Sequence, residues 1–275
     1  MTILERILPD VRRELAAAQS AVPVGEMKRR AADARPARDF AAALGTGGFG
    51  LIAEIKRRSP SMGDMRAENV QQAAAAYEAS DIVRAVSVLT NETHFGMGMA
   101  DLSQVAAHST KPVLRKDFII DPYQVYAARG AGADAVLLMA NVLPAQEMKD
   151  LHALVLDLGM QSLFEVHEAE EITKLPPSAK VVGINSRKFK SRDGFVEHGR
   201  SADQDFTLDL GAFELACRLP EGCIRVAESG VTPQTVAALA RDFYAALVGT
   251  SILRDPRGVE SALHDFSGAL AGGGH

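Results

Sequence analysis

The sequence predicts an α/β protein with the (β/α)8 TIM-barrel fold and an N-terminal helical extension. This prediction rests on three features of the chain. Apolar segments of strand length alternate with helix-like segments from about residue 50 onward, which is typical of right-handed β-α-β crossovers and a parallel sheet. About eight strand-like segments can be counted, and eight strands close a parallel barrel. A chain of 275 residues that is 47% hydrophobic is long enough for one such domain, which we expect to span residues 1–275.

Residues 1–45 precede the first expected strand and form the helical extension. Their apolar residues recur at helix-like spacings, and Pro23 and Pro36 are the expected breaks between helices. The glycine-rich run 45–50 then ends the last of these helices, and the barrel begins after it.

The barrel strands are expected where short apolar runs end in charged or polar residues. In chain order they are 51–56, 85–90, 112–116, 135–139, 161–166, 181–185, 224–228 and 245–249. Helices are expected between them at 69–80, 101–109, 122–130, 144–158, 168–175, 208–219 and 232–242. Asp121 and Thr232 each stand before a proline, as N-cap residues often do, and Gly130 and Gly159 follow expected helix ends. A doubly wound open sheet is the alternative, but the strand count and the lack of an early Gly-x-Gly-x-x-Gly turn favour the barrel.

The charge distribution of the chain restricts its partners. The net charge is −5 and the longest basic run is the segment 56–58, so neither a nucleic acid nor a membrane surface is expected as a partner. A small anionic substrate is compatible with this charge. The first residues lack the continuous apolar core of a signal peptide, and no apolar stretch is long enough to span a bilayer. We therefore expect a soluble, cytoplasmic protein.

Cysteine and histidine spacings give no sign of a metal site. Cys217 and Cys223 lie close together between a helix pattern and a strand pattern, and we expect buried or partly buried free thiols there. His94 and His167 lie near strand ends, but no pair of histidines has the spacing of metal ligands. The connection 188–205 is polar and aperiodic, and loops of that length are usually functional lids or disordered insertions.

Charged and polar residues gather at the carboxyl ends of the expected strands. In a parallel barrel all these ends open on one face, so such residues converge even when they are far apart in the sequence. The residues on this face are Glu54, Lys56, Thr90, Lys116, Glu165, Asn185, Arg187, Glu228 and Ser229. Unpaired charges in apolar strands would cost several kcal/mol, so we expect a catalytic cluster or a structural ion-pair network, and the second does not exclude the first. Lys116, which ends an apolar strand and precedes Asp117, is the first catalytic candidate.

Two glycine-containing strand ends predict a phosphate site. Gly230 follows the seventh expected strand, and Gly249 and Thr250 end the eighth. Glycine lets backbone N–H groups approach an anion, and the loops after these two strands are a frequent phosphate site in barrels. Ser59, after the first strand, could add a hydroxyl donor. The alternative is that these are tight turns that only need glycine.

Taken together, these segments resemble the indole-3-glycerol phosphate synthase family of tryptophan biosynthesis. The matching segments are 52–61, 86–90 with 95–96, 112–121, 132–138, 165–167, 183–185 with Arg187, 228–230 and 248–251. The resemblance implies a barrel with an added N-terminal helical segment and a carboxy-lyase activity. The reaction is ring closure of 1-(2-carboxyphenylamino)-1-deoxyribulose 5-phosphate to indole-3-glycerol phosphate, with loss of carbon dioxide and water. Neither a metal nor an organic cofactor is implied, and the partner is this small phosphorylated substrate.

The resemblance also implies roles for individual residues. Lys116 would act as the general acid at the substrate ketone, and Lys56 and Glu165 would supply the acid and the base for dehydration. The other residues of the implied catalytic group are Glu54 and Glu228, which would hold the lysines, together with Asn185 and Ser229. Substrate binding is implied for Arg187, for the phosphate cradle of Ser59, Gly230, Gly249 and Thr250, and for an apolar wall of Phe95, Phe118 and Leu137.

The chain departs from the usual family pattern at three places. Ser186 stands where the family usually has a second asparagine, Met62 stands where it has a basic residue, and the segment 190–205 is an insertion. None of these changes replaces a candidate acid or base. A phosphosugar aldolase with a Schiff-base lysine and a binding-only barrel that uses the insertion as a contact surface remain the alternatives. The chain is expected to be monomeric or weakly associated with other pathway enzymes.

Overall fold

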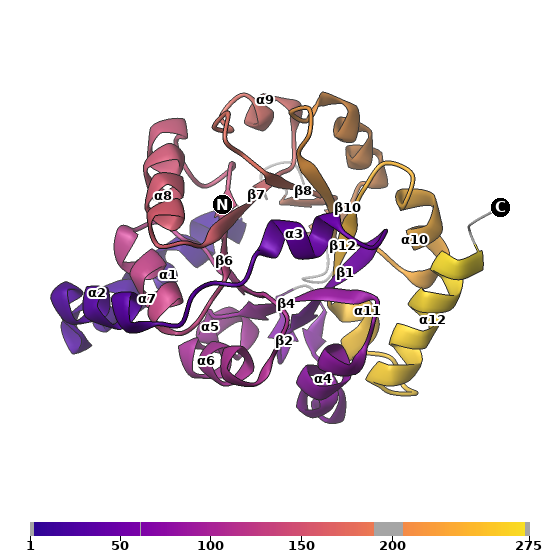
Figure 1. Cartoon of the computed structure of the whole chain (residues 1–275), viewed down its shortest axis with the longest axis horizontal. Coiled ribbons are helices and arrows are strands. Elements are labelled where there is room, and N and C mark those ends of the chain that lie inside the picture. The colour runs from indigo at the N-terminus through magenta and orange to yellow at the C-terminus, as the bar shows by residue number, and fades with distance from the viewer. Residues whose placement is uncertain (1–2, 61, 190–205, 273–275) are drawn as a thin grey trace, which may run out of the picture.

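Eight parallel strands close into a barrel at the centre of the molecule (Figure 1). The computed structural model describes residues 3–60, 62–189 and 206–272. The barrel strands are β1 (Gly50–Ile55), β4 (Val83–Leu89), β5 (Val113–Lys116), β6 (Ala135–Met139), β7 (Gln161–Val166), β8 (Val181–Asn185), β11 (Ile224–Glu228) and β12 (Ala245–Val248). Each pairs with its neighbours in parallel, and β12 closes the ring on β1. The predicted (β/α)8 barrel is therefore confirmed.

Helices cover the outside of the barrel between successive strands. They are α4 (Ala67–Ala79), α5 (Glu92–Phe95), α6 (Met99–His108), α7 (Pro122–Gly130), α8 (Ala145–Asp157), α9 (Ala169–Ile172), α10 (Pro233–Leu239), α11 (Thr250–Leu253) and α12 (Val259–Gly272). A helix is present within the predicted range 208–219, but it is the 3₁₀ helix η3 (Leu210–Arg218) and not an α-helix. The helix expected at 168–175 is shorter than predicted, since α9 ends at Ile172, and Pro176 disfavours helical backbone at Leu175.

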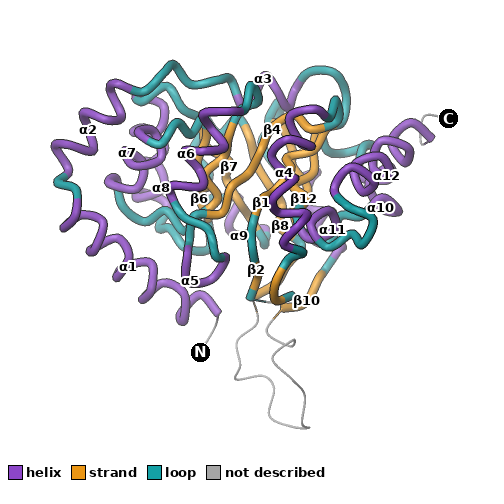
Figure 2. The backbone as a smooth tube through the Cα atoms, turned by 90° about the horizontal axis from the view of Figure 1, so that it is seen from below, coloured by secondary structure: helices purple, strands orange, loops and turns teal. Residues whose placement is uncertain are grey.

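The N-terminal extension forms three helices that reach both ends of the barrel. They are α1 (Ile3–Ala21), α2 (Val24–Asp33) and α3 (Phe40–Gly45), with the predicted breaks at Pro23 and Pro36. Helix α2 packs along α7, and α3 lies over the amino-terminal end of the strands with Phe40 and Leu44 buried. Figure 2 shows α3 at one end of the barrel and the small strands β2 (Arg58–Ser59) and β10 (Phe206–Leu208) at the other.

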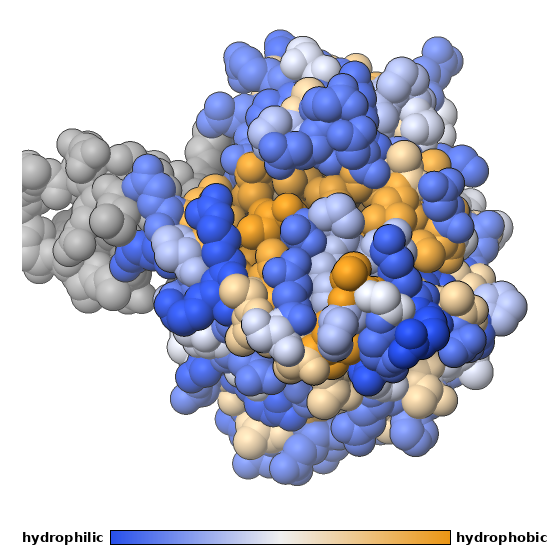
Figure 3. Space-filling view, turned by 90° about the vertical axis from the view of Figure 1, so that its left-hand side faces the viewer, coloured by the Kyte–Doolittle hydropathy of each residue, from blue (hydrophilic) through white to orange (hydrophobic). Residues whose placement is uncertain are grey.

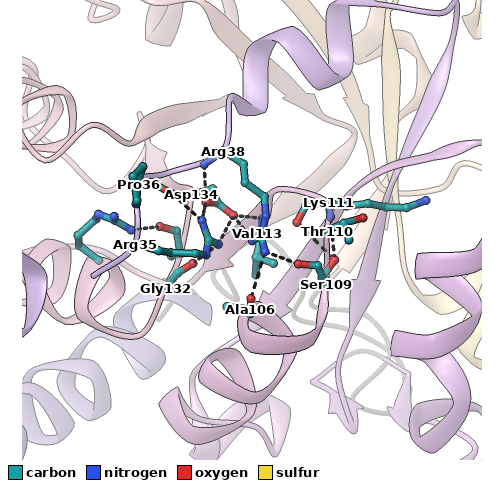
Figure 4. A network of polar contacts seen from close by, with 12 residues as sticks. Arg35, Pro36, Arg38, Ala106, Ser109, Thr110, Lys111, Val113, Gly132 and Asp134 are labelled. Atoms are coloured by element: carbon teal, nitrogen blue, oxygen red, sulfur yellow. Dashed lines mark hydrogen bonds and ion pairs between the residues drawn. The ribbon is translucent and has the colours of Figure 1, made fainter. Parts of the chain in front are cut away.

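A buried carboxylate fastens this extension to the barrel (Figure 4). Asp134, just before β6, has no exposed surface and accepts hydrogen bonds from Arg35 Nη1 at 2.8 Å and from the backbone N–H of Arg38 at 2.7 Å. The same carboxylate accepts from the backbone N–H of Val113 at 2.8 Å. The segment between α2 and α3 is thereby fixed to the starts of β5 and β6, which holds α3 over the barrel end.

Two apolar layers form the core. One fills the barrel interior and includes Ile52, Leu114 and Leu163, while the other lies between the strands and the outer helices.

On the side that carries α2 and α8, hydrophobic residues also gather in a hollow between hydrophilic ones (Figure 3). Among the described residues, no helix has both the length and the apolar character that crossing a membrane requires.

Several local predictions need correction. The left-handed glycine after α7 is Gly132 and not Gly130, whereas Gly159 is left-handed as expected. Cys223 is a buried free thiol, but Cys217 is exposed. The connection expected to be structureless from residue 188 begins as strand β9 (Arg187–Phe189), which pairs with β10. The insertion 190–205 lies outside the described residues.

Candidate active site

The alternation of side chains along each strand explains why the charged residues share one cavity. Successive residues of a strand point to opposite faces, and the inward set of β1 contains Ile52 in the barrel core and then Glu54. The same register places Glu165 inward beyond Leu163 on β7. Strands β1 and β7 thus contribute apolar side chains to the barrel core and a glutamate to the carboxyl end of the barrel.

Lys116 occupies the centre of the cavity. Its Nζ lies 2.9 Å from Glu165 Oε2 and 3.1 Å from Glu228 Oε2, and its side chain is 16% exposed. Burial alone would lower the pKa of Lys116, but the carboxylates of Glu165, Glu228 and Glu54 outweigh it and raise the pKa above its ordinary value. Lys116 is therefore a protonated ammonium, able to donate a proton or a charged hydrogen bond to an oxygen atom in the cavity.

A second lysine lies in the same cavity with its own carboxylate. Lys56 Nζ donates to Glu54 Oε1 at 2.5 Å, and both side chains are buried. Burial opposes ionisation of Glu54, but Lys56 and Lys116 outweigh it and lower the pKa of this carboxyl. A Cβ at Gly249 would lie 2.5 Å from Glu54 Oε1, so the glycine leaves the space in which this pair sits.

Glu165 and Glu228 have the same side chain but opposite pKa shifts. Both are 1% exposed and both contact Lys116. Burial raises the pKa of Glu228 to about 8, with Lys116 opposing and Glu165 adding to the rise. Burial also opposes ionisation of Glu165, but Lys116 and His167 outweigh it and lower its pKa to about 2. Neighbouring carboxyls with separated pKa values provide one proton donor and one acceptor, which suits acid–base chemistry.

Asn185 and Arg187 lie on the rim at the end of β8. Asn185 is buried, and its Oδ1 accepts a hydrogen bond from the backbone N–H of Arg187 at 3.0 Å. Burial lowers the pKa of Arg187, with Glu54 and Glu165 opposing. The guanidinium remains charged, and its fork of donors suits a carboxylate or a phosphate oxygen.

The predicted phosphate residues also line this cavity. Ser229 has a φ of 66° and Gly230 a φ of 68°. Left-handed backbone is uncommon for a residue other than glycine and occurs often at functional sites. The carbonyl of Ser229 accepts from Ser186 Oγ at 3.0 Å, which fixes the turn. Gly249, Thr250 and Ser59 line the same cavity.

Apolar side chains form the remaining wall. Phe95, Phe118 and Leu137 line the cavity as expected. The sequence prediction missed other apolar residues of the wall, namely Ile7, Pro60, Leu89, Met139, Val231, Leu247 and Val248. The inward register of the strands could have identified Leu89, Met139 and Leu247, but Ile7 belongs to α1 and no local pattern connects it with the barrel mouth.

Every residue of the predicted site therefore lines one cavity, and their individual roles remain predictions. Thr90, which the strand-end pattern also selected, is instead bound to a buried ion pair: its Oγ1 donates to Asp117 Oδ2 at 2.7 Å and accepts from Arg115 Nε at 3.0 Å. In the part of the chain that the structure describes, no group of three or more His, Cys, Asp or Glu side chains is placed to hold a metal ion.

Comparison with known proteins gives one consistent result. A family model described as indole-3-glycerol phosphate synthase matches residues 4–266. Indole-3-glycerol phosphate synthase of Saccharopolyspora erythraea is 43% identical over 232 residues, which cover 84% of this chain and 81% of that protein. Indole-3-glycerol phosphate synthase 1 of Streptomyces coelicolor is 40% identical over 270 residues, which cover 96% of this chain and 95% of that protein.

Solved structures show the fold alone. 3-Hexulose-6-phosphate synthase from Salmonella typhimurium has a TM-score of 0.56 at 13% identity, covering 82% of this chain and 100% of that one. Thiamine phosphate pyrophosphorylase from Pyrococcus furiosus has a TM-score of 0.55 at 12% identity, covering 86% of this chain and 100% of that one. At such identities the likeness extends to the barrel and not to the chemistry.

Proposed function

The chain belongs to the indole-3-glycerol phosphate synthase family, and on this premise we propose that it is a carboxy-lyase of tryptophan biosynthesis. It closes the ring of 1-(2-carboxyphenylamino)-1-deoxyribulose 5-phosphate to give indole-3-glycerol phosphate, carbon dioxide and water. The observation that carries this proposal is the ammonium of Lys116 between Glu165 and Glu228 in a cavity with an apolar wall. We also propose that the chain is a single domain and acts in the cytoplasm.

Ring closure begins when the aromatic carbon that bears the carboxylate attacks the ketone carbon of the sugar chain. The ketone oxygen gains negative charge and needs a proton, which Lys116 supplies as general acid. The raised pKa of Lys116 keeps it protonated in the resting site. Phe95, Phe118 and Leu137 hold the aromatic ring, because their apolar surfaces match its faces.

Loss of carbon dioxide returns the bonding electrons to the ring and restores its aromaticity. The hydroxyl left on the former ketone carbon then leaves as water, which requires a second proton on its oxygen. We assign that proton to Lys56, whose ammonium is held by Glu54. Glu165, which the lowered pKa keeps ionised, removes the proton from the neighbouring carbon, and the indole double bond forms. Each such proton transfer typically contributes about 10²–10⁴-fold to the rate.

Substrate binding uses the polar rim of the cavity. Ser59, Gly230, Gly249 and Thr250 bind the phosphate, and Ser229 holds the turn beside them. Arg187 and Asn185 orient the substrate carboxylate and hydroxyl groups. These contacts fix the reacting carbon near Lys116, and such positioning itself lowers the barrier.

The charge on Lys116 argues against the Schiff-base alternative. A lysine that attacks a carbonyl must be a neutral amine, and such lysines have lowered pKa values. Lys116 has a raised one because carboxylates surround it. Borohydride trapping of substrate on Lys116 or Lys56 would favour the aldolase alternative.

The test is the reaction itself. Purified chain is mixed with 1-(2-carboxyphenylamino)-1-deoxyribulose 5-phosphate, and indole formation is followed by absorbance or fluorescence. We expect turnover by the wild type and almost none by Lys116→Ala. A folded wild-type chain that forms no indole would refute the proposal, and turnover by Lys116→Ala near the wild-type rate would refute the assigned role of the lysine. If a chain shortened by residues 190–205 keeps its turnover, the insertion is not part of the catalytic apparatus.

A further inference from the structure

The proposed function, on which this inference rests, requires a proton from solvent in every turnover. The substrate carboxylate is ionised at neutral pH and leaves as neutral carbon dioxide. Two protons go to the ketone oxygen, which leaves as water, and one proton returns to the enzyme from the carbon beside it. The balance is one proton consumed per indole formed.

The groups that handle these protons are shielded from solvent. Glu165 is 1% exposed and Lys116 is 16% exposed before any substrate covers the cavity. Bound substrate would fill the open side, because its ring lies against the apolar wall. A second route for protons, away from the cavity mouth, would allow the acidic groups of the site to be reprotonated while substrate or product is bound.

His167 lies beside Glu165 and is not among the residues that line the cavity. It follows Glu165 by two residues, so the strand direction brings both side chains to the same face. The imidazole Nε2 lies 3.4 Å from Glu165 Oε1, and Nδ1 lies 3.5 Å from Glu171 Oε2. His167 does not line the cavity, so it acts on the reaction only through Glu165.

Glu171 connects the imidazole with the surface. Its side chain is 14% exposed, whereas that of His167 is 6% exposed. Glu171 Oε2 also accepts a hydrogen bond from the backbone N–H of His167 at 2.6 Å, which fixes the carboxylate beside the ring. Helix α9 begins between the two residues and sets their i,i+4 relation. Glu165, His167 and Glu171 therefore form a row from the cavity toward solvent, and small side-chain movements would bring the separations of 3.4 Å and 3.5 Å to hydrogen-bond length.

Among the described residues His152 is the other buried histidine, and its contacts show what is particular about His167. His152 Nδ1 lies 2.9 Å from Ser162 Oγ and its Nε2 lies 3.1 Å from Ser178 Oγ. Hydroxyl groups do not change charge near neutral pH, so the contacts of His152 hold the structure and do not supply protons. Each ring nitrogen of His167 instead faces a carboxylate, and an imidazole can accept a proton at one nitrogen and release another from the second.

We propose that His167 is a positioning residue that relays protons from solvent to the active site. Glu171 takes up a proton and passes it to Nδ1 of His167, while the N–H bond at Nε2 breaks and its proton forms an O–H bond on Glu165. Glu165 then returns a proton to Lys116, whose Nζ lies 2.9 Å away. The proton that Glu165 later removes from the substrate carbon replaces the one donated by Lys56 after product release, so one proton from solvent is consumed in each turnover. When the imidazole ring turns away from Glu165, Nδ1 releases its proton to water and Nε2 takes up a proton from water, which restores the starting tautomer without changing the proton balance.

The test compares His167→Ala, Glu171→Gln and the matched control His152→Ala. We expect kcat for indole formation to fall at least about tenfold in His167→Ala, less than the ~10²–10⁴-fold contribution of a directly acting acid or base. KM should change little, and the solvent deuterium isotope effect on kcat should rise. Glu171→Gln, which leaves the ring in place, should change kcat and the isotope effect in the same direction. His152→Ala should lose stability without a change in the isotope effect.

Adding small molecules to His167→Ala distinguishes a proton relay from a role in packing. Imidazole added to His167→Ala should restore kcat, whereas pyrazole, which has the same shape but is scarcely protonated at neutral pH, should not. Equal restoration by both compounds, or no restoration by either, would overturn the relay, as would wild-type kcat in His167→Ala and Glu171→Gln. These outcomes require an active wild type, so they are distinct from a failure of the proposed function, in which the wild type forms no indole.

Discussion

Replacing Lys116 by methionine removes the ammonium and keeps most of the apolar stem. Glu165 and Glu228, each 1% exposed, then lose the cation that lies 2.9 Å and 3.1 Å from their oxygens. Breaking a buried ion pair by removing one partner costs about 3–5 kcal/mol. We expect about 3 kcal/mol less free energy of unfolding near neutral pH, the lower end of this range, because the carboxyls can take up protons. Turnover should fall by about 10²-fold or more, since the general acid is lost.

The pH dependence of this loss follows from Glu165. In the wild type its pKa lies at about 2, below the ordinary 4.5, so this group stabilises the fold above pH 4.5 and the contribution is lost as the pH falls toward 2. Without Lys116, burial instead raises the pKa of Glu165 above 4.5. The sign then reverses, and the group destabilises the variant as the pH rises through the raised pKa. The free energy of unfolding that Lys116→Met loses relative to the wild type should therefore be larger at about pH 8 than at about pH 5.

Urea denaturation followed by circular dichroism at both pH values measures the deficit, and the indole assay measures turnover. Lys111→Met is the matched control, because Lys111 precedes β5 at the opposite end of the barrel and its Nζ donates to the carbonyls of Ser80 and Val83. That variant should lose stability and keep its kcat. If Lys116→Met matches the wild type in stability at both pH values, or matches Lys111→Met in turnover, the account of the buried cluster is wrong.

Two further predictions concern the surroundings of the cluster. In Gly183→Ala the new Cβ would overlap Glu228 Oε1, so kcat should fall more than KM changes. The control is Gly25→Ala, which has open space around it and should leave both kinetic constants unchanged. Equal kcat in the two variants would contradict the geometry. In Asp134→Asn the carboxylate that binds Arg35 and Arg38 is lost, and the free energy of unfolding should drop by about 2–3 kcal/mol with kcat preserved. An unchanged urea midpoint in that variant would show that the extension is held by apolar packing alone.

Much of the fold could be predicted from the sequence because the local hydrophobic patterns match the strands and helices of the barrel. The largely apolar runs 135–139 and 181–185 match β6 and β8 residue for residue, since burial on both faces leaves little room for polar residues. The type of the helix within 208–219 could not be predicted, because its residues allow both α and 3₁₀ geometry and the choice depends on how the segment packs on β8 and α9.

The candidate site, like the fold, could be predicted from the sequence only in part. The sequence determined that Lys116, Glu165 and Glu228 meet, because charges at the carboxyl ends of parallel strands have one common face. It did not determine which carboxylate serves which lysine, and the structure pairs Glu54 with Lys56 and the other two with Lys116. Nor could it place Ile7 of α1 at the cavity, since that contact depends on the path of the whole extension.

The sequence by itself therefore determined the barrel, its strand ends and the membership of the charged cluster, because these follow from periodicities of two and 3.6 residues and from parallel topology. Only the tertiary structure decided the protonation of Glu165 and Glu228. The two residues are the same amino acid at equivalent strand ends, yet one has a pKa of about 2 and the other of about 8. That difference arises because Lys116 and His167 lower the pKa of Glu165, whereas burial and the neighbouring Glu165 raise that of Glu228. Strands far apart in the chain create these contacts only when the barrel closes.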